Sequence, residues 1–128
     1  MIRVTATAGN NDSDKLPTFT VLSYNCLASH LATSSWFPRT DPKYLEFSYR
    51  SKALEQQFRQ LNADIACLQE INVNDFHTWL VPFMLSLGYA QGLLAKDRES
   101  ALMGVATFFK NDKFSLIEHR CVDGSRDQ

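Results

Sequence analysis

Residues 64–71, DIACLQEI, contain a short apolar segment that ends in a carboxylate, and the predicted fold is built around this segment. The segment 65–69 has the length and the residue types of a buried strand, and Glu70 follows it directly. Residues 18–24, TFTVLSY, are β-branched and aromatic and form a second such segment, which ends just before Asn25. The sequence therefore predicts two buried strands, each followed by a polar side chain.

A helix is predicted between these strands, since Ser48 can cap it and Asn62 can end it. Its apolar residues follow helical spacing: Ala53, Leu54, Phe58 and Leu61. A strand–helix–strand order favours a parallel pair of strands with a right-handed crossover. Because parallel strands end at the same edge, we expect Asn25 and Glu70 to lie on one rim, where open α/β sheets bind ligands.

A second helix is predicted after Glu70, with Asn72 or Asn74 as its cap. Its apolar residues recur at steps of three and one: Phe76, Trp79, Leu80, Phe83, Met84 and Leu87. Pro82 should kink or restart this helix, and Gly88 should end it.

The remaining segments predict further strands and one long loop. Strands are expected at 89–94, 104–110 and 114–119, and a turn at 111–113 favours a hairpin between the last two. Residues 26–47 form a long connection, and loops of this length are usually functional or mobile. Pattern alone therefore predicts a mixed α/β sheet.

The composition fits one small globular domain. With 128 residues, of which 45% are hydrophobic, the chain can bury a core. Its net charge of -1 argues against a histone-like nucleic-acid binder, although it permits a nuclease that holds a short strand in a local groove. No apolar run approaches the roughly 20 residues that span a bilayer, so no membrane partner is expected.

We expect residues 1–17 to form a flexible leader, which ends at Pro17 and lacks the apolar stretch of a secretory signal. The cysteines, Cys26, Cys67 and Cys121, are odd in number and widely spaced, a poor pattern for a disulfide framework or a zinc site. A reducing compartment, the cytoplasm, is therefore the expected location.

Glu70 is the candidate metal ligand. Mg²⁺ prefers oxygen ligands and is often held by one or two carboxylates together with substrate phosphate. A carboxylate beside the Asn25 amide suits that task, although spacing alone leaves open the alternative of an ordinary solvated glutamate. Arg50, Lys96 and Arg98 are candidate substrate-binding residues because their charges suit phosphate, and ordinary surface charges explain them equally well.

The sequence around Asn25 and Glu70 also resembles motifs of a known protein family. LSYNCLA at 22–28 and DIACLQEI at 64–71 resemble the first two signatures of the endonuclease/exonuclease/phosphatase superfamily. The deadenylase branch, comprising the carbon-catabolite-repressor type, nocturnin and the angel-like proteins, is the most similar. Further matches to that branch follow in the same order at 44–50, 87–89, 104–110 and 113–114. The resemblance spans about residues 18–118 and corresponds to the amino-terminal half of the domain.

This resemblance implies a fold and a reaction. The fold is α/β, part of a four-layer sandwich of two packed mixed sheets with outer helices. Residues 18–120 would be the amino-terminal half of that domain, and 121–128 an unassigned tail. The reaction would be hydrolysis of a phosphodiester with Mg²⁺, or Mn²⁺, at the 3′ end of RNA such as a poly(A) tail. Glu70 would be a direct metal ligand and Asn25 an active-site amide.

The family's other active-site groups come later in its chain: an Asp-x-Asn pair, an Asn-Thr-His strand end and an Asp-x-His. None is matched at a corresponding later position of residues 1–128, and His30, His77 and His119 are expected to be structural or exposed. The chain alone is therefore expected to be inactive, with an exposed sheet face that favours association. Residues 103–105, Met-Gly-Val, also depart from the branch's Asp-Gly-Cys, which affects substrate contacts there.

Two other functions remain open at this point. The chain would be a non-catalytic truncated paralogue that acts as a binding module, or another phosphoesterase of the same superfamily. In the second case the substrate would be a nucleotide cofactor, abasic DNA, an inositol phosphate or sphingomyelin.

Overall fold

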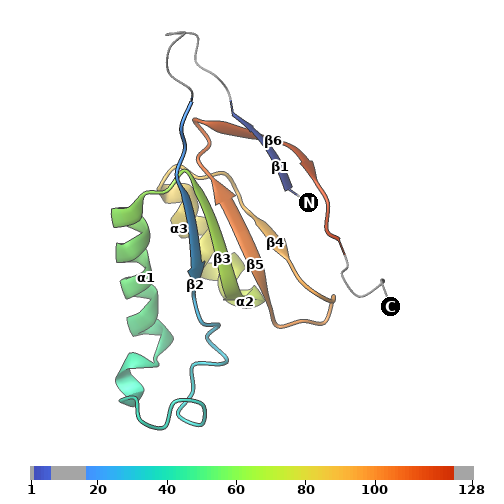
Figure 1. Cartoon of the computed structure of the whole chain (residues 1–128). Coiled ribbons are helices and arrows are strands. Elements are labelled where there is room, and N and C mark those ends of the chain that lie inside the picture. Colours follow the sequence, from blue (N-terminus) through green and yellow to red (C-terminus); the bar gives the residue numbers. More distant parts are fainter. Residues whose placement is uncertain (1, 7–16, 123–128) are drawn as a thin grey trace.

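The computed structural model describes residues 2–6 and 17–122, and its centre is a four-stranded mixed sheet. The strands lie in the order β2 (Val21–Asn25), β3 (Ile65–Asn72), β5 (Met103–Phe109) and β4 (Leu93–Ala95). As predicted, β2 and β3 are parallel, whereas β5 runs antiparallel to both β3 and β4 (Figure 1). The predicted α/β class is therefore confirmed.

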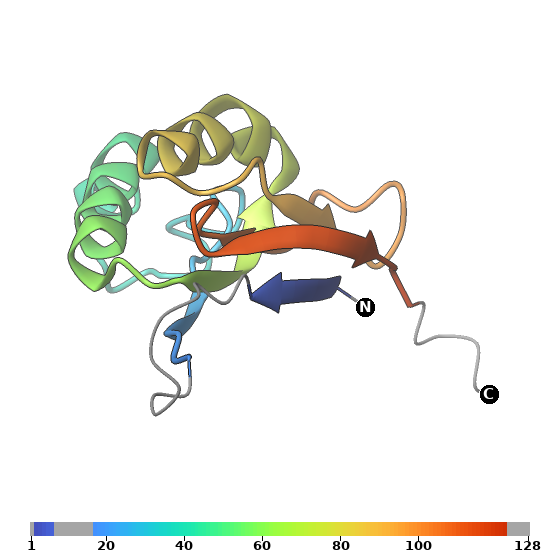
Figure 2. The same cartoon turned by 90° about the horizontal axis from the view of Figure 1, so that it is seen from above.

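The helices cover one face of this sheet, as Figure 2 shows. The chain passes through a 3₁₀ turn, η1 (Pro42–Tyr44), into α1 (Phe47–Leu61), which connects β2 to β3. After β3 come α2 (Val73–Asp75), a π-helical turn η2 (Phe76–Leu80) and α3 (Val81–Ser86). Among the described residues, none of the helices has the length and apolar character that crossing a bilayer requires.

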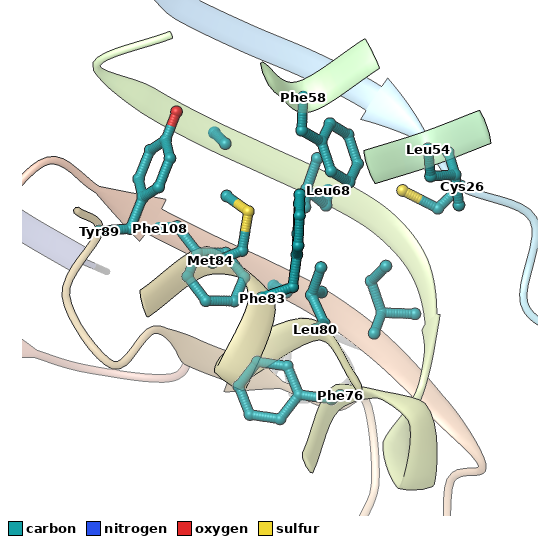
Figure 3. Close-up of a cluster of buried hydrophobic side chains, with 13 residues drawn as sticks. Cys26, Leu54, Phe58, Leu68, Phe76, Leu80, Phe83, Met84, Tyr89 and Phe108 are labelled. Atoms are coloured by element: carbon teal, nitrogen blue, oxygen red, sulfur yellow. The ribbon is translucent and has the colours of Figure 1, made fainter. Parts of the chain in front are cut away.

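The core lies between the helices and the sheet (Figure 3). Leu68 of β3 and Phe108 of β5 are fully buried against it, and Phe58 of α1 packs there edge-on to the ring of Tyr24. The largest fully buried side chains are Phe58, Phe108, Leu68, Leu80 and Met84. Because each such side chain stabilises the fold by about 1.5–3 kcal/mol, this layer holds the helices on the sheet.

The opposite face of the sheet is only partly covered in the described part of the chain. Val21 is 58% exposed and Val105 is 43% exposed. The strand predicted at 18–24 is confirmed from Val21 onward, but it is not buried on both sides: only alternate residues, Leu22 and Tyr24, pack partly buried against the core. A strand with cover on one side shows this alternation of burial.

Most helix ends lie where the sequence predicts them. Asn62 ends α1 in a left-handed conformation, and Asn72 caps α2 by accepting a hydrogen bond from the Asp75 amide at 3.1 Å. The predicted cap at Ser48 is wrong, since α1 begins two residues earlier, after Glu46, without a side-chain cap. Pro82 lies in the first turn of α3, where a proline restarts a helix without losing a hydrogen bond.

The predicted hairpin at 111–113 is wrong. β6 (Phe114–His119) pairs antiparallel with β1 (Ile2–Ala6) in a separate two-stranded sheet. The turn, in which the Lys113 and Phe114 amides both donate to the Lys110 carbonyl, leads the chain away from β5. Residues 2–6 of the expected leader thus form a strand, and the rest of the leader, 1 and 7–16, lies outside the described residues.

Asp64, at the amino end of β3, forms hydrogen bonds with two other segments of the chain. Its carboxylate accepts a hydrogen bond from the Thr20 amide at 2.9 Å and one from Lys113 Nζ at 2.8 Å, although the aspartate is only 7% exposed. The bond from Lys113, followed by that from the Thr20 backbone, holds the pKa of Asp64 below its usual range. This carboxylate joins the starts of β2 and β3 to the turn before β6.

We predict that Asp64→Asn lowers stability at neutral pH and that the difference from wild type narrows in acid. A carboxyl whose pKa is lower in the folded state stabilises above its unfolded value of about 3.9, and this stabilisation is lost as the pH falls through the folded value. Urea unfolding of both proteins between pH 7 and pH 2.5 measures the difference. A gap that is the same at every pH would contradict this account.

Candidate active site

A bulge in β3 sets the position of Glu70. Leu68 pairs with Ala106 and Ile71 pairs with Gly104, so Gln69 and Glu70 together lie opposite a single residue of β5. Glu70 takes a φ of 54°, in the left-handed region that side-chain-bearing residues adopt at a cost of roughly 1–2 kcal/mol. Glu70 was predicted to follow the strand, and that is wrong, because β3 continues past it to Asn72.

The bulge changes where this carboxylate lies. In a regular strand Glu70 would share the face of Leu68, which is fully buried under the helices. Instead it borders a cavity of about 430 Å³ at the carboxyl-end rim, together with Gln69, Arg98 and Met103. No hydrogen bond or ion pair engages the Glu70 carboxylate among the described residues. A strained backbone at a carboxylate that borders a cavity is typical of a functional position.

Asn25 lies on the same rim, since it pairs with Gln69, the residue before Glu70. Its Oδ1 accepts a hydrogen bond from the Leu27 amide at 2.9 Å, and Leu27 itself has a φ of 55°. The side chain borders a neighbouring hollow of about 260 Å³ rather than the Glu70 cavity. The shared rim is as predicted, whereas joint contact of Asn25 and Glu70 with one metal ion stays a prediction.

Arg50 positions the turn that follows Asn25. Its Nη2 donates to the Cys26 and Leu27 carbonyls, each at 2.5 Å. Burial lowers the pKa of Arg50, and burial also raises the pKa of the Cys26 thiol to about 12, so that this cysteine stays protonated and packs as a small apolar residue. The predicted contact of Arg50 with substrate remains a prediction beside this observed contact with the backbone.

The other predicted phosphate contacts lie in the connection between β4 and β5. Arg98 borders the Glu70 cavity, so the structure brings these two residues together. Lys96 donates from Nζ to the Glu99 carbonyl at 2.6 Å and borders a different hollow. Arg98 is therefore the better placed of the two for a ligand beside Glu70.

His30 also borders this cavity, although sequence reasoning did not select it. Its Nδ1 lies 3.0 Å from Asn72 Nδ2, at the end of β3. No pattern in the long loop 26–47 marks this residue, because its position depends on how the loop folds back over the rim.

A larger cavity, about 670 Å³, lies at the opposite end of the sheet. It is lined by Asp64, Lys110 and Lys113, whose charged groups bond within the protein: Asp64 to Lys113, and Lys110 to the Leu87 carbonyl. The carboxylate of Glu70 has no such partner, and we therefore place the candidate site at the smaller cavity. Within the described ranges no group of three or more His, Cys, Asp and Glu side chains surrounds a possible metal position.

Comparison with known proteins identifies similar chains. The model of the Endonuclease/Exonuclease/phosphatase family matches residues 22–128. The CCR4-Not complex 3'-5'-exoribonuclease subunit Ccr4 of Debaryomyces hansenii is 36% identical over 119 residues, which cover 87% of this chain and 14% of that protein. Carbon catabolite repressor protein 4 homolog 2 of Arabidopsis thaliana is 36% identical over 111 residues, 82% of this chain and 18% of that protein. The chain thus spans only a small part of the length of these relatives.

Two solved structures match the fold of this chain. ANGEL2, described as a 2',3'-cyclic phosphatase, matches with a TM-score of 0.73 at 29% identity, over 78% of this chain and 29% of its own. The catalytic domain of human Nocturnin matches with a TM-score of 0.61 at 22% identity, over 91% of this chain and 39% of its own. At that identity the second match shows the fold alone.

We predict that Glu70→Gly stabilises the chain by about 1 kcal/mol, because glycine adopts a positive φ without the clash of a Cβ atom. Glu70→Gln is the matched control, since it removes the charge but keeps the strained backbone and should lie within about 0.5 kcal/mol of wild type. Urea unfolding measures both. A glycine variant that is less stable than the glutamine variant would show that the bulge stores no strain at this residue.

Proposed function

Because this chain belongs to the endonuclease/exonuclease/phosphatase family, we propose that it supplies part of the active site of a metal-dependent phosphodiester hydrolase acting on the 3′ end of RNA. One observation carries the proposal. The bulge in β3 places Glu70, whose carboxylate lacks a protein partner among the described residues, at the border of a cavity that Arg98 also borders.

Glu70 suits a Mg²⁺ or Mn²⁺ ligand. Such ions prefer oxygen ligands and keep several of their waters, so that a single carboxylate can be the main protein contact. When bound, the ion polarises the phosphoryl oxygen and stabilises charge on the leaving oxygen. Since the described residues contain no group of three or more His, Cys, Asp and Glu side chains that could hold a metal ion, the proposal requires additional groups from the rest of the domain.

The other rim residues would orient the substrate. The Asn25 Oδ1 is engaged by the Leu27 amide, which leaves the Nδ2 group as the donor for a phosphate oxygen. Arg98 would neutralise the phosphate from the far side of the cavity. Arg50 would act indirectly, by holding the backbone after Asn25 in place. A general base for water is not among these groups and belongs to the part that the proposal requires from elsewhere.

The substrate class follows from the relatives. The Ccr4 proteins are named as 3'-5'-exoribonucleases, which favours an RNA 3′ end as the substrate. The poly(A) tail and the cytoplasmic location expected from the sequence are part of the same proposal. A second candidate is a terminal 2′,3′-cyclic phosphate, because ANGEL2 is described as a 2',3'-cyclic phosphatase and is 29% identical. Both are phosphodiesters at an RNA 3′ end, so the same metal and donor groups serve either one.

We predict that residues 1–128 alone do not hydrolyse either RNA end, because the described residues contain no group of three or more side chains that could hold the metal ion, and hydrolysis also needs a positioned base. The same chain extended through its downstream reading frame should hydrolyse at least one of them with Mg²⁺. The substrates are 5′-labelled oligo(A) and an oligonucleotide ending in a 2′,3′-cyclic phosphate.

Glu70→Gln in the extended protein should lower the rate by roughly a hundredfold or more. Rapid hydrolysis that is unaffected by this substitution would overturn the role of Glu70. An extended protein that is folded but inactive on both substrates would instead favour a binding module.

A further inference from the structure

The amide of Asn72 has a defined orientation. Its Oδ1 accepts a hydrogen bond from the Asp75 amide at 3.1 Å and so caps α2. Its Nδ2 therefore points the other way, and it lies 3.0 Å from His30 Nδ1. The capping bond thus settles which end of the amide faces the imidazole, a choice that is otherwise ambiguous.

This orientation determines the role of His30 Nδ1 in the hydrogen bond. An amide nitrogen donates two hydrogens and has no lone pair to accept one. The Nδ1 atom of His30 must therefore accept the bond from Asn72, which requires that Nδ1 carry no proton. In the neutral ring the proton then resides on Nε2. With Nδ1 as the acceptor of the bond from Asn72, Nε2–H is the remaining polar group of the ring.

His30 stands at the candidate site. Its ring is exposed at the mouth of the cavity that Glu70 and Arg98 border, and it reaches that position from the loop after β2. Both this loop and the β4–β5 connection lie at the lower edge of the sheet in Figure 1. Apart from the bond to Asn72, no hydrogen bond engages the ring within the described residues, so Nε2–H is available to a ligand.

We propose that His30 is a substrate-binding residue that donates from Nε2–H to a non-bridging oxygen of the substrate phosphate. This rests on the proposed function, in which Glu70 binds the metal ion and Arg98 faces the phosphate. A neutral imidazole adds a directional donor to the charge of Arg98. The same geometry argues against His30 as the general base, because neither ring nitrogen then offers a free lone pair to a water molecule.

The first test is the state of the ring, measured by long-range ¹H–¹⁵N correlation of histidine in the 128-residue chain. His30 should show the Nε2–H tautomer near neutral pH. Asn72→Asp is the matched variant, since aspartate caps α2 equally well but offers His30 only an acceptor. It should move the proton to Nδ1. A wild-type ring with Nδ1 protonated would overturn the inference.

The second test is binding of adenosine 5′-monophosphate with Mg²⁺, followed by chemical shifts. His30→Ala should weaken binding about fivefold, as expected for the loss of one neutral hydrogen bond. His30→Gln, which retains a donor, should restore part of the affinity. His77→Ala, on the exposed side of η2, should leave it unchanged. Wild-type affinity in His30→Ala, or no binding by the wild type, would overturn the inference.

Line broadening by Mn²⁺ separates this result from the metal site. Broadening centred on Glu70 in both wild type and His30→Ala, with weaker nucleotide binding in the variant alone, supports both proposals. Binding that depends on His30 without broadening at Glu70 would support the His30 contact and overturn the metal site. Broadening at Glu70, with nucleotide binding unchanged in His30→Ala, would support the metal site and overturn the His30 contact.

Discussion

The parallel pairing of β2 with β3 places Asn25 opposite Gln69, one residue before Glu70. That pairing requires a crossover, and α1 supplies it while packing Leu54 and Phe58 into the core. It also requires that the amino ends of both strands stay in register, which the Asp64 carboxylate secures through the Thr20 amide. The candidate site lies at the other end of these same two strands, so its geometry is set by their pairing.

The second constraint is the bulge. Gly104 of β5 lies so close to β4 that a Cβ atom there would stand 2.4 Å from the Ala95 carbonyl oxygen. β5 is thus held tightly against β4, and the extra residue is accommodated in β3, where Glu70 takes the left-handed conformation. The strained backbone of Glu70 and the close packing of Gly104 against β4 therefore both follow from the register of one sheet.

The sequence predicted the features that depend on local signals. The strand segments before Asn25 and Glu70 and the helix stop at Asn62 all follow from residue types within a few positions. The bulge at Glu70, the pairing of β6 with β1 and the position of His30 were not predictable in this way. Each depends on a partner distant in the sequence, such as Gly104 for the bulge and Asn72 for His30. The catalytic roles of Asn25 and Glu70 rest on family resemblance and remain proposals.

The proposed function requires that Glu70 bind a divalent metal ion at the carboxyl-end rim. Anomalous diffraction from crystals soaked in millimolar Mn²⁺ tests it most directly, with a Glu70→Gln crystal treated in the same way. The account predicts an anomalous peak in contact with the Glu70 carboxylate and no peak at that position in the variant. A peak that persists in the variant, or one found beside Asp64 at the opposite end of the sheet, would contradict it.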